Sequence, residues 1–118
     1  MDRTMEVLVG LKDYEMALGV VRGVGLVVRE VERRDADLAR QMRRAVSSVP
    51  LNIAEGEGVR GGNQRLRFET ALGSAREVRA CVDVAVAMGY VDKAALSALE
   101  DRVDHVIAVL FKLAQRRS

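Results

Sequence analysis

The 118-residue chain is 49% hydrophobic and 31% charged, a balance that fits one folded domain over residues 1–118 and is too apolar for a disordered chain. Its 19 basic and 17 acidic residues leave a net charge of +2, which alone does not indicate a nucleic-acid-binding protein. One cysteine and one histidine exclude an internal disulfide, a cysteine-based zinc site and a multi-histidine metal site.

The first predicted helix runs from about residue 11 to residue 33, where apolar residues recur at helical spacing. Between Met16 and Val28 it is apolar on nearly every side, although a helix in a monomeric bundle needs only one buried stripe. The surplus apolar face predicts contact with a second copy of the chain, and the residues predicted at that interface are Val20, Val24 and Val27. The alternative is looser packing of a poorly optimised helix, whose glycines each disfavour the helix by about 1 kcal/mol relative to alanine.

The second predicted helix follows Asp35, whose side chain suits an N-cap. Pro50 lies inside this segment, where proline lacks an N–H and crowds the carbonyl four residues earlier. Ser47, Ser48 and Asn52 are close enough in sequence to satisfy freed backbone groups. We therefore expect either a second helix that is kinked near Pro50 or two shorter helices.

A glycine-rich loop over residues 56–62 precedes a third helix, which is predicted to begin after Asn63 and to stop at Gly89. A fourth helix follows the N-cap candidate Asp92. The four periodic segments have similar lengths and short connections, and none shows the alternation of a strand. The predicted fold class is therefore all-α, an antiparallel up-down-up-down four-helix bundle.

No secretory or membrane-spanning segment is expected. Asp2 and Glu6 interrupt the apolar run at the start of the sequence. The longest apolar stretch, residues 16–28, is shorter than the roughly 20 residues that a membrane span needs. The single Cys81 agrees with a reducing compartment. We therefore expect a cytoplasmic protein that makes no contact with a membrane.

Asp101, Asp104 and His105 come nearest to a catalytic or metal-binding group. Asp101 and His105 can share one helix face, but neither Cys81 nor any serine has an assignable base. The Glu-x-x-His spacing of bundle metal sites is absent, so a solvated helix face is the favoured interpretation. The glycine-rich loop lacks the Gly-Lys-Ser/Thr ending of a phosphate-binding loop and follows no strand. We therefore predict no catalytic residue, no metal, no cofactor and no enzyme activity.

Residues 41–56 read QMRRAVSSVPLNIAEG. This stretch resembles the signature QxRRAxxSIPxNIAEG of a four-helix-bundle family first recognised as reading frames inside intervening sequences of bacterial 23S ribosomal RNA genes. Further matches to the family pattern are Phe68, the ALGS run at residues 71–74, Glu77 and the GYV run at residues 89–91. The resemblance covers nearly the whole chain. Departures fall at residues 13–14, 32–34 and 57, where the family often has Trp, Phe-Pro and an aromatic residue.

The resemblance implies a ring-like homopentamer of antiparallel four-helix bundles, for which no enzymatic activity is established. The accessory proteins of diversity-generating retroelements are similar basic, pentameric bundles that associate with a reverse transcriptase and its RNA. A reverse transcriptase is thus a partner suggested by analogy of fold. The leading hypothesis is a non-enzymatic homo-oligomeric assembly protein that scaffolds RNA, DNA or an enzyme acting on them. The alternative is a protein-binding adaptor with no nucleic-acid contact.

Glu55 and Glu77 lie within these motifs and are expected to face the bundle among apolar neighbours. A buried carboxylate needs a partner, and the candidate partners are Arg44, Ser47, Ser48, Asn52 and Ser74. A structural polar network that fixes the helix register is favoured over a catalytic pair.

Charge is unevenly distributed along the chain. Residues 38–81 hold eight arginines and four glutamates, a net charge of +4, whereas residues 82–105 hold two basic and five acidic residues, a net charge of −3. In a homo-oligomer an arginine-bearing surface is repeated, so weak phosphate contacts add through avidity. We predict weak, sequence-independent binding of RNA or DNA, carried by Arg43, Arg60, Arg65 and Arg67 with contributions from Arg116 and Arg117. Arg44 is expected to turn inward as a structural partner, and the alternative is an ordinary solvated face laced with ion pairs.

Overall fold

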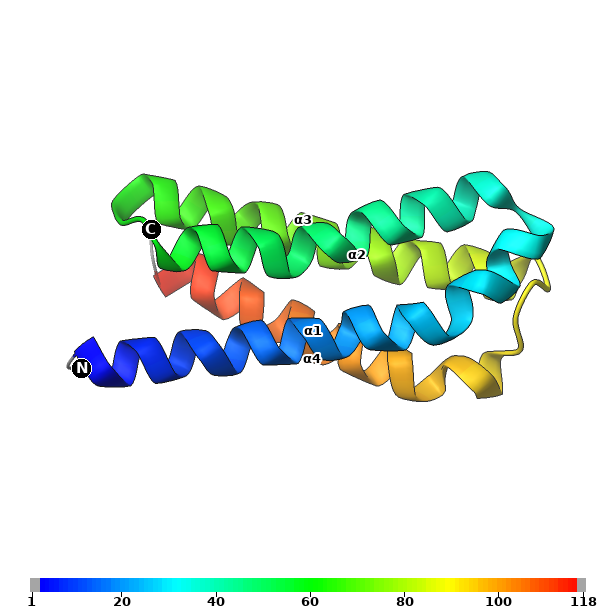
Figure 1. The fold of residues 1–118 in the computed structure, drawn as a ribbon, viewed down its shortest axis with the longest axis horizontal. Coiled ribbons are helices and arrows are strands. Elements are labelled where there is room, and N and C mark those ends of the chain that lie inside the picture. Colours follow the sequence, from blue (N-terminus) through cyan, green and yellow to red (C-terminus); the bar gives the residue numbers. More distant parts are fainter. Residues whose placement is uncertain (1–2, 117–118) are drawn as a thin grey trace.

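Four helices make up the part of the chain that the computed structural model describes, namely the backbone of residues 3–116 and the side chains of residues 10–115. They are α1 (Arg3–Arg34), α2 (Ala36–Glu57), α3 (Gly61–Ala87) and α4 (Lys93–Arg116). Successive helices run in opposite directions (Figure 1), and no strand occurs between residues 3 and 116. The predicted all-α four-helix bundle is confirmed.

The turns divide the molecule into two ends. The α1–α2 and α3–α4 turns lie at one end of the 47 Å long bundle, which we call the double-turn end (Figure 1). The α2–α3 turn lies at the other end, beside the start of α1 and the end of α4. We call this the glycine-loop end, after Gly58, Gly61 and Gly62.

One apolar core runs between the four helices. Its largest fully buried side chains come from every helix, and they include Val24 in α1, Met42 and Ile53 in α2, Phe68 in α3 and Leu110 in α4. Buried residues recur at intervals of three and four along each helix, so each helix turns one stripe toward the core. Burying one such large side chain contributes about 1.5–3 kcal/mol to folding.

The predicted N-cap closes the α1–α2 turn. Asp35 has an extended backbone with φ of −156°, and its Oδ1 atom accepts a hydrogen bond from the Leu38 N–H at 3.0 Å. This bond satisfies one of the free donors at the start of α2. The other carboxylate oxygen of Asp35 accepts a hydrogen bond from the Tyr90 hydroxyl at 3.1 Å. Asp35 therefore joins the two turns of the double-turn end.

The end of α3 is a Schellman motif, as the position of Gly89 predicts. Gly89 has a φ of +75°, a conformation open to glycine at little cost. Its N–H donates to the Val86 carbonyl at 3.0 Å. The Tyr90 N–H donates to the Ala85 carbonyl at 2.9 Å. These two bonds define the motif and satisfy carbonyls at the helix end.

The starts of two helices differ from the predicted ones. α1 begins well before the predicted residue 11, and α3 begins at Gly61, ahead of Asn63. The cap position of α3 is Arg60, whose side chain makes no capping hydrogen bond. Gln64 joins the first turn of α3 to the end of α2, because its Nε2 donates to the Gly56 carbonyl at 3.0 Å. This bond satisfies a carbonyl at the end of α2, so the predicted side-chain cap of α3 is absent and not replaced.

α2 continues through Pro50 as one helix, so the alternative of two shorter helices is wrong, while the kink stays a prediction. Ser47 and Asn52 each donate to the carbonyl four residues earlier, at 2.8 and 2.9 Å. Because Pro50 has no N–H, the Val46 carbonyl lacks its usual helical donor, and neither side chain donates to it. The polar residues around Pro50 thus bond to the backbone, but at neighbouring carbonyls.

The interface residues predicted on α1 need correction. Val20 and Val24 are 2% and 1% exposed, so both side chains are enclosed in the core of their own chain and offer no surface to another copy. Val27 is half-buried at the edge of the core, and its place in an interface stays a prediction. The surplus apolar surface of α1 lies on another face, where Leu26 is 86% and Leu11 is 55% exposed.

Candidate functional site

An uncharged polar network joins α2 to α3 near Pro50. The Ser74 hydroxyl donates to Ser48 Oγ at 2.7 Å. Asn52 Nδ2 donates to the same Ser48 oxygen at 2.9 Å. All three side chains are half-buried, and removing one partner leaves the others unsatisfied. The network therefore favours one register of the two helices, but the two glutamates for which the sequence predicts that role are not part of it.

Two ion pairs flank this network on the surface. Arg44 Nη2 lies 3.4 Å from Glu77 Oε2, and Arg67 Nη1 lies 3.0 Å from Glu55 Oε2. The expectation that both glutamates face the bundle interior is wrong, because the Glu55 and Glu77 side chains are 57% and 42% exposed. Arg44 is also turned outward, at 74% exposure. Both carboxylates join α2 to α3 through ion pairs at the surface.

Gly56 allows a close approach between these two helices. A Cβ atom at this position would lie 2.7 Å from Cε1 and 3.0 Å from Cδ1 of Phe68. The Phe68 ring is fully buried and has no free space into which to move. Glycine at residue 56 is therefore a packing requirement of the ring, and the motif that ends in this glycine describes a helix contact.

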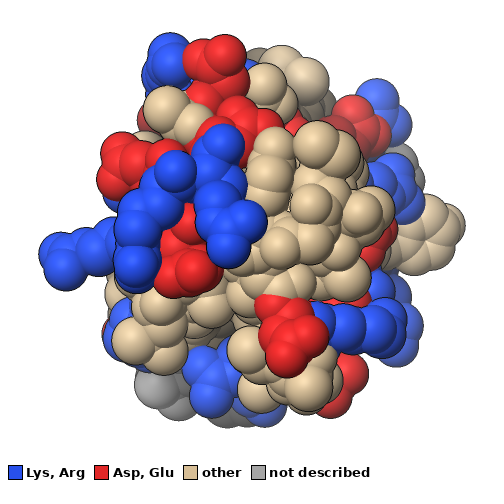
Figure 2. Space-filling model, turned by 90° about the vertical axis from the view of Figure 1, so that its right-hand side faces the viewer, with Lys and Arg blue, Asp and Glu red and all other residues tan. Residues whose placement is uncertain are grey.

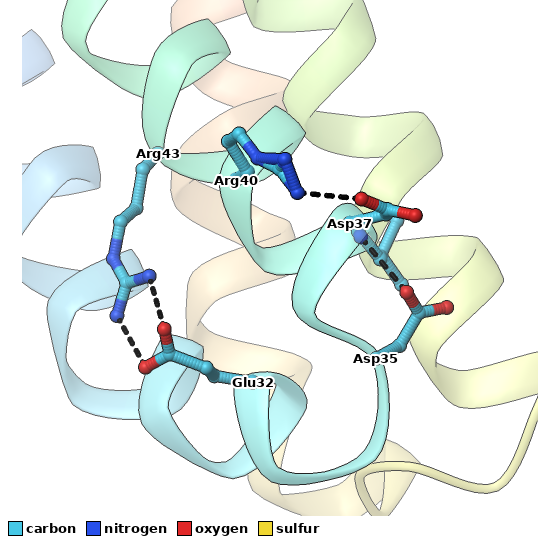
Figure 3. Close-up of polar contacts among 6 residues, drawn as sticks. Glu32, Asp35, Asp37, Arg40 and Arg43 are labelled. Atoms are coloured by element: carbon cyan, nitrogen blue, oxygen red, sulfur yellow. Dashed lines mark hydrogen bonds and ion pairs between the residues drawn. The ribbon is translucent and has the colours of Figure 1, made fainter.

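The structure separates the arginines that were predicted to bind nucleic acid. Arg43 lies near the double-turn end, where its Nη1 and Nη2 donate to the two carboxylate oxygens of Glu32 at 3.0 and 3.1 Å (Figure 3). The Arg43 guanidinium holds the pKa of the Glu32 carboxyl below its ordinary value, through these bonds first and its charge second. At 1.5 Å per residue along α2, Arg43 is about 20 Å from the glycine-loop end.

Charges at the double-turn end are mixed. Basic and acidic side chains lie next to one another around uncharged surface (Figure 2). Arg33 pairs with Glu30 at 2.9 Å, and Arg40 pairs with Asp37 (Figure 3). Arg33, Arg40 and Arg43 therefore each have a carboxylate beside them.

Three of the predicted arginines lie near the glycine-loop end, although Arg65 and Arg67 point to different sides of α3. Arg65 pairs with Glu69 at 3.5 Å, and Arg67 pairs with Glu55. Arg60 is exposed and makes no ion pair within residues 10–115. The side chain of Arg116 and the whole of Arg117 lie outside the described residues, although α4 ends at this same end (Figure 1).

A groove of about 380 Å³ opens between α1 and α4. It is lined by Met16 and Gly19 from α1 and by Asp101, Arg102 and His105 from α4. Within the described residues no hydrogen bond joins Asp101 to His105. The predicted sharing of one helix face by these two residues is met, but the imidazole is not oriented by the carboxylate.

An ion cluster between α3 and α4 has no counterpart in the sequence interpretation. Arg79 Nη1 lies 2.6 Å from Glu100 Oε2, and Arg79 Nε lies 3.1 Å from Asp104 Oδ1. Glu100 is only 7% exposed, and the hydrogen bond from Arg79 lowers its pKa. The one signal available in the sequence was the four-residue spacing of Arg79 and Asp83, which lie 3.5 Å apart. Because Asp104 is engaged here, it does not join His105 in a metal site.

Titratable groups elsewhere supply no reactive centre among the described residues. Cys81 is buried, and burial first, with the Glu77 carboxylate second, raises the pKa of its thiol. A thiol with a raised pKa stays protonated at neutral pH and is a weak nucleophile. In the part of the chain that the structure describes, no three or more His, Cys, Asp and Glu side chains come together as metal ligands. Over the same residues, no helix combines the length and the apolar character that crossing a membrane requires.

The comparisons with known proteins agree with this fold. The sequence profile of the 23S rRNA-intervening sequence proteins matches residues 11–112. A similar solved structure is a protein with unknown function from the S23 ribosomal protein family of Bacteroides thetaiotaomicron, with a TM-score of 0.74 and 18% sequence identity over 93% of this chain and 97% of that one. At this identity the likeness concerns the fold alone. No curated protein sequence matches the chain. Since the matched profile spans most of its length, the chain belongs to the 23S rRNA-intervening sequence protein family.

Proposed function

We propose that this chain is a non-enzymatic assembly protein whose copies associate through their helices into a homo-oligomer. The observation that carries the proposal is the apolar surface left outside a complete core. On α1 and α3 the exposed fractions are 86% for Leu26, 55% for Leu11 and 57% for Leu66, and Met88, which caps the end of α3, is 61% exposed. Apolar surface on the outer sides of two helices is typical of proteins that bind other proteins. A pentamer is the size that the family resemblance implies.

We further propose that the assembly makes weak contacts with RNA or DNA at the glycine-loop end. Arg60 is exposed without an ion pair in the described residues, and the Arg65 and Arg67 side chains are 46% and 47% exposed. The family takes its name from an intervening sequence of 23S rRNA, which supports a nucleic-acid partner. Because the chain has no Trp and the loop no aromatic residue, phosphate contacts rather than base stacking would carry the affinity. A reverse transcriptase is the protein partner proposed by analogy.

Sedimentation velocity and native mass spectrometry at micromolar concentration test the assembly. A closed homo-oligomer larger than a dimer is the expected result. A 13.0 kDa species alone would contradict the assembly, whereas a dimer would contradict only the pentamer.

A titration of labelled structured RNA at about 50 and 200 mM salt tests the nucleic-acid contact, since phosphate binding releases counterions and weakens steeply between these concentrations. The test variant is Arg60/Arg65/Arg67→Glu. The matched control is Arg33/Arg34/Arg40→Glu at the double-turn end, which also removes one arginine without an ion pair and two with one.

The expected result is lost binding in the test variant and retained binding in the control, with both variants still oligomeric. Equal binding by the wild type and the test variant would remove the glycine-loop end from the contact. Absence of binding at low salt would leave the alternative function, a protein-binding adaptor without nucleic-acid contact.

A further inference from the structure

α1 carries apolar side chains on the side that faces away from the core. Leu11 is 55% exposed, Leu18 is partly exposed, and Leu26 is 86% exposed. They follow one another at seven and eight residues, so at 100° per residue they fall on one side of the helix, spread over about 80°. We call this side the α1 face. Val20 and Val24 turn the opposite side of α1 into the core, so the α1 face is free to meet another molecule.

The outer side of α3 has a complementary shape. Gly73, Ala80 and Ala87 recur every seven residues there, and all three are exposed. A Cβ atom built on Gly73 would meet nothing within 4 Å, which means that a neighbouring helix can approach the backbone closely. Leu66 and Val84, 57% and 45% exposed, add apolar surface beside these small residues. We call this surface the α3 face.

Charges on the two faces are also complementary. Glu15 precedes Arg22 by seven residues on α1, and Arg76 precedes Asp83 by seven residues on α3. All four are exposed. Glu15, Arg22 and Arg76 form no ion pair with the described residues. Asp83 remains 61% exposed beside Arg79. When the two helices run parallel, the acid and then the base on α1 can therefore lie opposite the base and then the acid on α3.

One parallel register satisfies both patterns. In this register Glu15 lies opposite Arg76. The shared seven-residue spacing then brings Arg22 opposite Asp83. The leucines of the α1 face fall beside the small residues of the α3 face, because both sets repeat at nearly the same interval. Large side chains packed over small ones allow close helix contact.

The long sides of the molecule also offer enough area for a stable contact. The described chain measures 47 × 21 × 18 Å, so the outline of a long side covers roughly 850–990 Å² and the outline of an end about 380 Å². Each partner in a stable interface buries about 800 Å², an area that only a long side can supply. The double-turn end, with its mixed charges (Figure 2), is too small to act alone. Contact along the helices is the geometry that fits.

We propose that the α1 face of one copy docks on the α3 face of the next, with the two helices parallel and the Glu15–Arg76 pair setting the register. The inference rests on the proposed homo-oligomer and names the surfaces that form it. α1 and α3 occupy opposite corners of the bundle (Figure 1). Each copy thus uses two different faces, and such a contact builds a ring where the rotation between copies closes and an open filament where it does not.

Charge reversal tests this pairing. Glu15→Arg and Arg76→Glu each place like charges opposite one another, and each is expected to raise the dissociation constant of the assembly about tenfold or more. The double variant Glu15→Arg/Arg76→Glu restores opposite charges and is expected to return the dissociation constant to within about threefold of the wild-type value. The measurement is sedimentation velocity over the micromolar range, with circular dichroism to verify that each variant stays helical.

Asp101→Arg and Lys112→Glu are the matched controls, because they reverse exposed charges on α4 and are expected to leave assembly unchanged. Dissociation by both single variants with recovery in the double variant supports the proposal. Single variants that assemble like the wild type, or a double variant that stays dissociated, overturn the α1–α3 contact while the assembly proposal stands. A wild-type chain that is monomeric throughout overturns both.

Discussion

The seam between α2 and α3 and the seam between α1 and α4 join neighbouring helices of one bundle, yet they are built differently. Along α2–α3, Gly56 admits the Phe68 ring, and Ser48 bonds to Ser74 at 2.7 Å. The contact between α1 and α4 is the least extensive of the four neighbouring pairs. There a groove of about 380 Å³ lies open over Gly19.

This difference shows what the family-like motif encodes. Ser48, Asn52 and Gly56 lie where α2 and α3 meet, whereas Ser47 is exposed and bonds to the Arg43 carbonyl of its own helix. The motif therefore specifies how two helices pack. The contact of α1 with α4 is less extensive, although Gly23 lies close to Leu99 there. The outward leucines of α1 supply the surface of the proposed assembly.

The largest expected difference between the two seams concerns the two phenylalanines. Phe68→Ala should lower the free energy of unfolding by about 3–5 kcal/mol, because it leaves a cavity beside α2 that the packed helices cannot fill. Phe111 on α4 is 46% exposed, and Phe111→Ala should cost less than about 1 kcal/mol. Urea denaturation followed by circular dichroism measures both. Similar losses for the two variants would mean that the α2–α3 seam is no more tightly packed than the surface of α4.

A pair of glycines gives the next largest effect. Gly56→Ala forces a Cβ atom to 2.7 Å from the Phe68 ring, and such overpacking costs about 1–3 kcal/mol, more than the roughly 1 kcal/mol that alanine adds to helix propensity. Gly19→Ala on α1 meets no atom nearer than 3.8 Å, Nη1 of Arg102, and should stabilise the protein by about 0.4–1 kcal/mol. Thermal unfolding compares the variants, and a stabilising Gly56→Ala would contradict the close approach of α2 and α3.

The serine network provides a smaller effect that a double-mutant cycle isolates. Ser48→Ala and Ser74→Ala should each cost about 1 kcal/mol. The double variant should cost less than the sum of the two single variants. Each single variant leaves one serine hydroxyl without its partner, whereas the double variant removes both hydroxyls. Ser97→Ala is the control, since Ser97 is exposed and bonds only to the Ala94 carbonyl at 3.3 Å. Strict additivity of the two variants would show that the 2.7 Å contact contributes nothing to stability.

The sequence predicts the helices well because the relevant signals are local. Apolar spacing identifies four segments, and Asp35 and Gly89 act within a few residues of their own positions. The interface prediction on α1 is wrong for two residues, since a helix that is apolar nearly all round does not reveal by spacing which side faces the core. Val20 and Val24, predicted at an interface, are buried in the core of their own chain.

The partners of the charged residues were beyond sequence interpretation for a different reason. Arg43 meets Glu32 across the α1–α2 turn, and Arg79 meets Glu100 across two helices. Such pairs depend on the angle and register at which the helices pack. A single sequence does not predict this angle and register. The same limit explains why Glu55 was expected inside the bundle and lies on its surface beside Arg67.

The smallest expected effect is the response to acid, which differs because one set of helix contacts contains a titrating group and the other does not. The α2–α3 network consists of hydroxyl and amide groups, which do not titrate. α4 is held to α3 by Glu100, whose pKa is lowered first by its hydrogen bond from Arg79. A carboxyl group whose pKa is lowered in the folded chain stabilises the fold at pH values above its ordinary pKa near 4.5. That stabilisation is lost as the pH falls through the lower pKa of the folded chain.

Unfolding measured between neutral pH and pH 3 should therefore show a steeper loss of stability on the acid side in the wild type than in Glu100→Gln. Glu32→Gln is the control, because Glu32 also has a lowered pKa but its side chain is 50% exposed, where solvent screening weakens the pair with Arg43. Hydrogen exchange at acid pH should reach the amides of α4 before those of the α2–α3 seam. An acid limb that Glu100→Gln leaves unchanged would show that packing rather than the Arg79 cluster holds α4 in place.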